Sequence, residues 1–158
     1  SFAKNNIENV DFIFLLSLMI IDGSDNVDYF IYKFNISKKN QKRLLLLNNF
    51  FSNKINNKFF SKNNLQKILY FNGKQSLLDL INFQIFKSKK VDKKLLEMIE
   101  FFKDKEPPLL PVSAATLMNK YNIPEGKTLG IMLKKIENKW LDNNFQISEK
   151  DIQKVIKN

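Results

Sequence analysis

Residues 107 to 145 read PPLLPVSAATLMNKYNIPEGKTLGIMLKKIENKWLDNNF. Every other stretch of the chain shows only the pattern of an amphipathic helix, whereas this one contains further signals. A proline-rich entry leads to Ser113, a residue type suited to capping a short helix. Residues 122 to 126, Asn-Ile-Pro-Glu-Gly, predict a turn. A longer helix should follow, with Gly126 and Gly130 in its first turns. Its apolar residues recur at helical spacing and predict one buried face: Leu129, Met132, Leu133, Ile136, Trp140 and Leu141.

The remaining residues also indicate helices. Glycine and proline are scarce, at four residues each, and few segments alternate cleanly as a half-buried strand would. Serine, aspartate, asparagine and glycine bound the apolar segments and predict caps and turns. The expected helices span residues 7–21, 26–34, 38–53, 61–70, 77–86 and 92–102, with a polar loop at 54–60 and a last helix capped by Ser148.

The fold class that follows is all-α, an irregular helical bundle or array of about eight or nine short helices. The first helix, residues 7–21, is apolar nearly all round and is therefore expected at the centre of the core. Two prolines end the helix before residue 108, so Lys103 to Pro111 is a candidate hinge. The expected parts are residues 1–104 and 105–158, or one continuous domain.

Composition excludes several kinds of chemistry. The 158 residues include no cysteine and no histidine, which excludes disulfides, Cys/His zinc sites and histidine general-base catalysis. The formal net charge is +10, and a positive field of this size favours a polyanionic partner such as RNA. The alternative is codon bias, because lysine and asparagine are abundant throughout and Arg43 is the only arginine.

No membrane segment or cleaved leader is expected. The longest apolar run, Phe12 to Ile21, is interrupted by Ser17 and is shorter than the roughly 18 residues that a spanning helix needs. No small-residue cleavage site follows a basic start. The chain begins at Ser1 without a methionine, and we expect it to be a fragment or a processed product.

The quoted stretch resembles the C-terminal end of the tRNA nucleotidyltransferase (CCA-adding enzyme) and bacterial poly(A) polymerase family. Over about forty positions the matching residues are Pro111, Val112, Ser113, Leu117, Met118, Gly126, Gly130, Leu133, Ile136, Trp140 and Phe145. The chain departs from the family pattern at Ala114 for Gly, Thr116 for Asp, Asn122 for Gly and Lys127 for Pro. Residues 65–83, LQKILYFNGKQSLLDLINF, are similar to the family's element of helix, Tyr-x-x-Gly turn and helix.

The resemblance implies the RNA-binding C-terminal region of such an enzyme, in which a helical body (residues 1–104) and tail (105–158) clasp tRNA in the cytoplasm. A separate N-terminal catalytic head domain would then add CCA to the tRNA 3′ end, using Mg and CTP/ATP. The head's Gly-Ser opening and Asp-x-Asp metal pair are absent from these residues, so we expect no catalytic residue, metal or cofactor in this chain. The alternatives are a poly(A) polymerase C-terminal region, a degenerate half of a split enzyme, or a helical protein-interaction module with no RNA role.

The candidate RNA-binding residues fall in two groups. Cations at a helix N-terminus oppose the helix dipole, and a bound anion would offset that cost; this selects Lys38, Lys39, Lys42 and Arg43. The second group surrounds the turn before the long C-terminal helix, where backbone N–H groups and glycines allow close approach of a phosphate: Gly126, Lys127, Gly130, Lys134 and Lys135. The alternatives are a solvated lysine face for the first group and glycines that let two helices pack tightly for the second.

Overall fold

The computed structural model describes residues 10–53, 59–88 and 92–157. Over these ranges it contains eight helices and no strand, which confirms the all-α class. The chain divides into two compact units, Ser1–Pro107 and Pro108–Asn158, near the boundary at 104/105 that the prolines indicated. None of the described helices is both long and apolar enough to cross a membrane.

The first described helix, α2 (Phe12–Ile20), is less central than its composition predicted. Asp11 is its N-cap and accepts a hydrogen bond from the backbone N–H of Phe14, while the expected start at residue 7 lies outside the described residues. Phe14, Leu16 and Ile20 are buried. Three apolar side chains on another face are 72%, 51% and 80% exposed, namely Phe12, Leu15 and Met19. The prediction that this helix lies at the centre of the core is therefore wrong, because three of its apolar side chains face away from the core.

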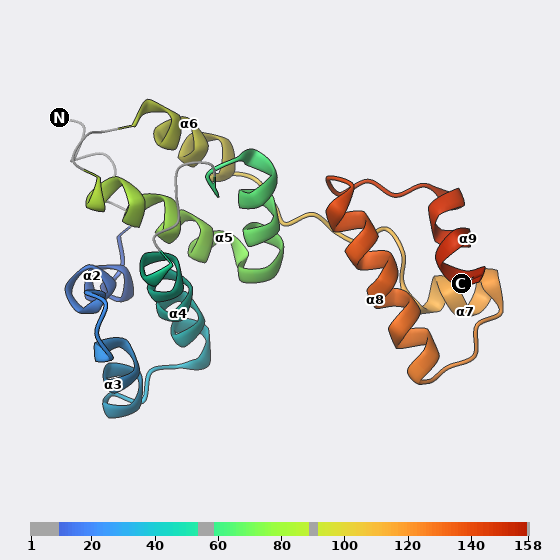
Figure 1. Ribbon diagram of the computed structural model, residues 1–158, viewed down its shortest axis with the longest axis horizontal. Coiled ribbons are helices and arrows are strands. Elements are labelled where there is room, and N and C mark those ends of the chain that lie inside the picture. The colour runs from blue at the N-terminus through green and yellow to red at the C-terminus, as the bar shows by residue number, and fades with distance from the viewer. Residues whose placement is uncertain (1–9, 54–58, 89–91, 158) are drawn as a thin grey trace. The chain divides into compact units, whose positions relative to one another are not determined.

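The described residues of unit 1 form four more helices (Figure 1): α3 (Asn26–Lys33), α4 (Lys38–Ser52), α5 (Lys62–Lys87) and α6 (Lys93–Phe102). Ser61 and Asp92 cap α5 and α6 with their side chains, as expected. Gly73 has φ 81° and ψ 169° and breaks α5 into two halves, at the Asn-Gly pair where the sequence predicted a break. Figure 1 shows the resulting bend, which directs the two halves of α5 differently.

The core of unit 1 is formed by the inward faces of α2, α4, α5 and α6. Phe60, expected in a polar loop, is instead buried and lies edge-on to Phe50, with 5.4 Å between ring centroids. Residues 54–58 of that loop lie outside the described residues. The fully buried core side chains include Leu44, Leu47, Leu65, Leu69, Leu77, Leu80, Ile81 and Phe102.

Unit 2 contains α7 (Ala114–Tyr121), α8 (Lys127–Asp142) and α9 (Glu149–Lys157). Ser113 caps α7 in a reciprocal capping box with Thr116, and Asn122 ends it in the left-handed conformation, at φ 54°. The predicted apolar face of α8 is confirmed, since Leu129, Met132, Leu133, Ile136, Trp140 and Leu141 are buried or half-buried. Leu129 and Ile136 of this face form a second core with Val112, Leu117, Ile123 and Ile152, and Met132 and Leu133 pack against it.

Surface ion pairs attach α9 to its two neighbours. Glu149 accepts a hydrogen bond from the Tyr121 hydroxyl and pairs with Lys120, at 2.5 and 2.8 Å. Asp151 accepts from the Ser148 hydroxyl at 2.6 Å and pairs with Lys139 at 3.2 Å. Hydrogen bonds from Ser148, and then the contact with Lys139, lower the pKa of Asp151 to about 2.

Acid should therefore destabilise unit 2. A carboxylate whose pKa is lower in the folded state than its unfolded value of about 4 stabilises the fold above that value, and the stabilisation is lost as the pH falls towards 2. Trp140, the only tryptophan, is buried in this unit, so its fluorescence in the whole chain reports unfolding of unit 2. We expect Asp151→Asn to lower stability at about pH 7 and to flatten the acid limb. An unchanged acid limb would contradict this assignment.

Candidate anion-binding pocket

A pocket of about 570 Å³ lies in unit 1 between the start of α4 and the bend in α5. Five cationic side chains from these two helices line it. Its lining residues are Lys38, Lys39, Lys42 and Arg43 from α4, and Phe71, Asn72, Gly73, Lys74, Gln75 and Ser76 from α5. The first group of candidate residues is thus brought to one hollow, together with residues that the sequence analysis did not select.

Lys38, Lys39 and Lys42 are exposed and form no ion pair with any described residue. Ser37 occupies the N-cap position of α4 without donating or accepting a side-chain cap bond, so the first turn keeps backbone N–H groups without a capping partner. Cations at this end oppose the helix dipole by a few tenths of a kcal/mol each. Folding of α4 does not account for three lysines here.

The opposite wall of the pocket begins a second helical segment. Because Gly73 interrupts α5, Lys74, Gln75 and Ser76 form the first turn of its second half. Lys74 is one-third exposed and pairs with Glu106 at 2.7 Å. A positive φ near 81° is a conformation in which glycine is favoured, and no atom lies within 4 Å of the Cβ that another residue would add. The glycine is therefore required by backbone conformation and not by close packing.

Ser76 lies at the base of this wall and is only 4% exposed. No hydrogen bond joins its hydroxyl to another described residue, although Ser17 and Ser88 both donate to helical carbonyls. The hydroxyl oxygen itself is accessible to solvent, because Asn48 Oδ1 is the buried side-chain atom that lacks a partner among the described residues. Its place in the lining of a pocket that is otherwise cationic gives it access to an acceptor bound there.

Arg43 differs from the lysines beside it, because two carboxylates already bind it. Its Nε donates to Asp79 at 2.6 Å, and its terminal nitrogens donate to both oxygens of Asp11 at 2.6 and 2.8 Å. Asp79 also accepts from Gln75 at 3.0 Å. Arg43 is 4% exposed. The expectation that it is a free RNA-binding cation is therefore replaced by a structural role beneath the pocket.

The environments of the two carboxylates differ. The hydrogen bond from Arg43 lowers the pKa of Asp11, which is half exposed. Burial raises the pKa of Asp79, and the hydrogen bonds from Arg43 and Gln75 oppose that effect. Burial also disfavours the charged guanidinium, but hydrogen bonds to Asp11 and Asp79 outweigh this and raise the pKa of Arg43. Arg43 is thus held in its charged form by its two partners.

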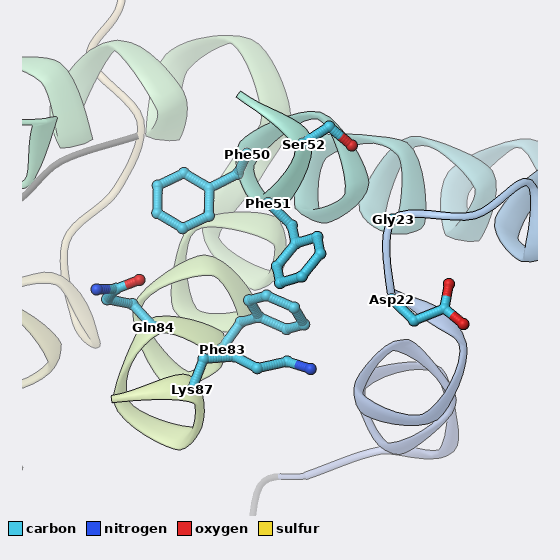
Figure 2. Close-up of a pocket in the computed structure, with 8 residues that line it drawn as sticks. All are labelled: Asp22, Gly23, Phe50, Phe51, Ser52, Phe83, Gln84 and Lys87. Atoms are coloured by element: carbon cyan, nitrogen blue, oxygen red, sulfur yellow. The ribbon is translucent and has the colours of Figure 1, made fainter. Parts of the chain in front are cut away.

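A second pocket in unit 1 has a different character (Figure 2). It has a volume of about 610 Å³ and lies among the loop after α2, the end of α4 and the second half of α5. Phe51 and Phe83 pack edge-to-face within it, and Lys87 Nζ lies 5.3 Å from the centroid of each ring. Lys87 also donates to the Ile21 carbonyl at 3.4 Å. The single cation of this pocket is thus already in use, and Asp22 on the rim opposes an anion.

The second group of candidate residues belongs to unit 2. Lys127, Lys134 and Lys135 are exposed on the side of α8 turned away from the buried Ile136, as an interval of 100° per residue requires. Lys134 also pairs with Glu137 at 2.5 Å. These lysines line no described pocket, so their placement does not distinguish a binding surface from a solvated face.

Close packing between helices does not explain the two glycines at the start of α8. A Cβ at Gly126 or at Gly130 would meet no atom within 4 Å, which contradicts the tight-packing alternative. Gly126 is the N-cap of α8 and has φ 142°, a conformation that other residues rarely adopt. Gly130 is exposed inside the helix, and nothing in the fold explains its lack of a side chain.

Sequence reasoning missed Phe71, Lys74 and Ser76. Their segment resembles the family's element of helix, Tyr-x-x-Gly turn and helix, and a break near Gly73 was expected. Neither observation indicates which residues lie opposite the break. The role of Arg43 had one signal, namely that it is the only arginine among 26 cationic residues. A planar guanidinium binds two carboxylates in a way that lysine does not, which favours arginine at a buried position.

Comparison of the chain with protein-family models, with curated proteins and with solved structures found no match. The resemblance to the tRNA nucleotidyltransferase family thus rests on the residues already named. Among the described residues no group of three or more acidic side chains is placed to hold a metal ion. The chemistry of the pocket is that of an anion-binding site built from lysines, backbone N–H groups and a hydroxyl.

Removal of Arg43 should destabilise unit 1. Arg43→Ala leaves buried Asp79 without its cation, and breaking a buried pair in this way costs about 3–5 kcal/mol. Arg43→Lys should lower the free energy of unfolding by less than that but still weaken the fold, because lysine keeps the charge without the planar set of N–H donors of the guanidinium. Urea unfolding followed by circular dichroism measures both effects. Lys42→Ala is the control, and its free energy of unfolding should stay within about 0.5 kcal/mol of the wild type. If Arg43→Ala lost no more stability than Lys42→Ala, the structural role of Arg43 would be contradicted.

The two glycines of α8 should respond oppositely to alanine. Gly130→Ala should stabilise unit 2 by about 0.5–1 kcal/mol, because alanine favours an exposed helix interior and the space is open. Gly126→Ala should destabilise it by about 1–3 kcal/mol, because φ is strained for any other residue. Trp140 fluorescence during urea unfolding compares the two variants. Destabilisation by Gly130→Ala would show that a neighbour occupies that space.

Proposed function

We propose that this chain binds the backbone phosphates of RNA, with the lysine-lined pocket of unit 1 as a principal contact. The observation that carries the proposal is the convergence of Lys38, Lys39, Lys42 and Lys74 around one hollow. The three α4 lysines have no carboxylate partner among the described residues. Such lysines bind phosphate as point charges and without base specificity.

Local structure supports the same ligand. The uncapped first turn of α4 presents backbone N–H groups, and the positive end of a helix dipole favours an anion. A bound phosphate would offset the repulsion among the lysines and between them and that dipole. The net charge of +10 adds a long-range field that speeds association with a polyanion. Codon bias explains an abundance of lysine but not its concentration at one pocket.

The finer proposal is that the RNA is tRNA and that the chain is the RNA-holding region of a tRNA nucleotidyltransferase. It rests on the resemblance of residues 107–145. Asn122 adopts the left-handed conformation where the family pattern has glycine, and Gly126 keeps a positive φ, so both positions have the backbone shape that a glycine would serve. Catalysis would belong to a separate head domain that binds Mg and CTP/ATP. A poly(A) polymerase would use the same region in a similar way.

The second candidate is a helical protein-interaction module, and one observation favours it. Phe12, Leu15 and Met19 form an exposed apolar stripe on α2, and apolar side chains gathered on one face are typical of surfaces that contact another protein. This reading requires no RNA affinity. The two functions therefore predict different results in a binding experiment with RNA: the first predicts measurable affinity, and the second requires none.

The test compares a tRNA transcript with a single-stranded RNA of equal length at two salt concentrations. The wild-type chain should bind tRNA more tightly, and both affinities should fall steeply with salt. The triple variant Lys38→Gln, Lys39→Gln, Lys42→Gln should weaken binding and reduce the log–log salt slope by about two to three, or roughly one per lost phosphate contact.

A matched control removes three exposed lysines elsewhere in unit 1. Lys33, Lys93 and Lys94 are exposed, and the last two also begin a helix, α6, so changing all three to Gln alters net charge equally. An equal loss in both triple variants would show that only the overall field matters. Absence of measurable RNA binding by the wild type would rule out the RNA proposal and leave the interaction module.

A further inference from the structure

The lysine-lined pocket also contains an aromatic side chain that folding does not explain. Phe71 is 56% exposed and lines the pocket beside Lys38, Lys39 and Lys42. Its ring meets Tyr70 edge-on, with 5.0 Å between centroids and planes 70° apart. No ammonium of a described lysine lies over it, whereas Phe101 has two such lysines. An exposed ring at the rim of a cationic hollow offers a surface for stacking.

The residues after Phe71 add polar groups that suit a nucleotide. Asn72 lies next to the ring and lines the same pocket; its amide has both a donor and an acceptor, the groups that read the edge of a base. Beyond Gly73, Ser76 is a largely buried residue whose solvent-accessible hydroxyl has no hydrogen-bond partner among the described residues. It lies in the first turn of the second half of α5, at the positive end of a helical segment.

The pocket thus combines two kinds of recognition on opposite walls. The α4 wall supplies ammonium groups and an uncapped helix start, which suit a phosphate. The α5 wall supplies a ring, an amide and a hydroxyl within six consecutive residues, 71 to 76. A bare phosphate, or the backbone of a duplex, would use the first wall and leave the ring in water.

We propose that this pocket holds one unpaired nucleotide of RNA, with its base stacked on Phe71 and its phosphate among Lys38, Lys39, Lys42 and the Ser76 hydroxyl. The inference rests on the proposed RNA-binding function and names the part of the RNA that enters the pocket. A base inside an A-form helix is stacked on both faces, whereas bases in loops and at ends are free to stack on aromatic side chains. The preferred ligand is therefore a single-stranded segment or end.

The test measures affinity of the whole chain for three RNAs with equal numbers of phosphates. These are a single-stranded decamer, the same decamer with abasic positions, and a blunt duplex. Stacking on an aromatic ring contributes about 1–3 kcal/mol per base, so the wild type should bind the intact decamer about five- to a hundredfold more tightly than the abasic one. Phe71→Leu should abolish that difference and leave the salt slope unchanged.

Two controls separate stacking from folding and from charge. Phe34→Leu alters another exposed phenylalanine in unit 1, outside the pocket, and should keep the wild-type preference for the intact decamer. Lys42→Gln should lower the salt slope and keep the preference. Thermal unfolding of Phe71→Leu should match the wild type, because the ring is exposed.

The outcomes distinguish this inference from the proposed function. If the wild type binds the intact and abasic decamers equally, or Phe71→Leu keeps the preference, the nucleotide inference is overturned while RNA binding stands. If the wild type binds none of the three RNAs, both proposals fail. Tighter binding to the duplex than to the decamer would assign the pocket to the phosphate backbone alone.

Discussion

The two ion pairs of the buried Arg43 are the interaction on which the geometry of unit 1 depends. One guanidinium joins Asp11, the N-cap of α2, to Asp79 in the second half of α5, and α4 carries it between them. Because buried charges are stable only with well-placed partners, this pairing fixes the start of α4 against the segment after Gly73. Lys38, Lys39 and Lys42 lie one to five residues before Arg43 on α4 and are thereby held near Phe71 and Ser76, so the pocket depends on the ion pairs of Arg43.

The two units are stabilised in different ways. Unit 1 contains a large aromatic and aliphatic core and a buried cation with two carboxylates. Unit 2 has a smaller apolar core, and side-chain caps and exposed ion pairs join its three short helices. Exposed pairs contribute little each, so the packing of α8 against α7 and α9 must provide most of the stability of unit 2. Gly126, whose backbone conformation favours glycine, is the N-cap at which α8 begins.

Most helix boundaries in this chain could be predicted because local chemistry sets them. Ser61, Asp92 and Ser113 each accept a backbone N–H of the helix that follows, and an apolar spacing identifies the buried face of α8. The candidate site was only partly predictable. Lys38, Lys39 and Lys42 were found from their conflict with a helix dipole, but Arg43 was grouped with them because its charge has the same sign. Its partners lie 32 and 36 residues away, and nothing local indicates them.

The amino-acid sequence by itself determined that this chain is helical, that it lacks cysteine and histidine chemistry, and that it carries a strong positive charge. These properties depend on composition and on short-range periodicity. Only the tertiary structure decided which cation is buried, which face of α2 is exposed, and which residues from α4 and α5 surround one pocket. Such choices depend on contacts between residues distant in the chain, where burial and charge pairing outweigh local preference.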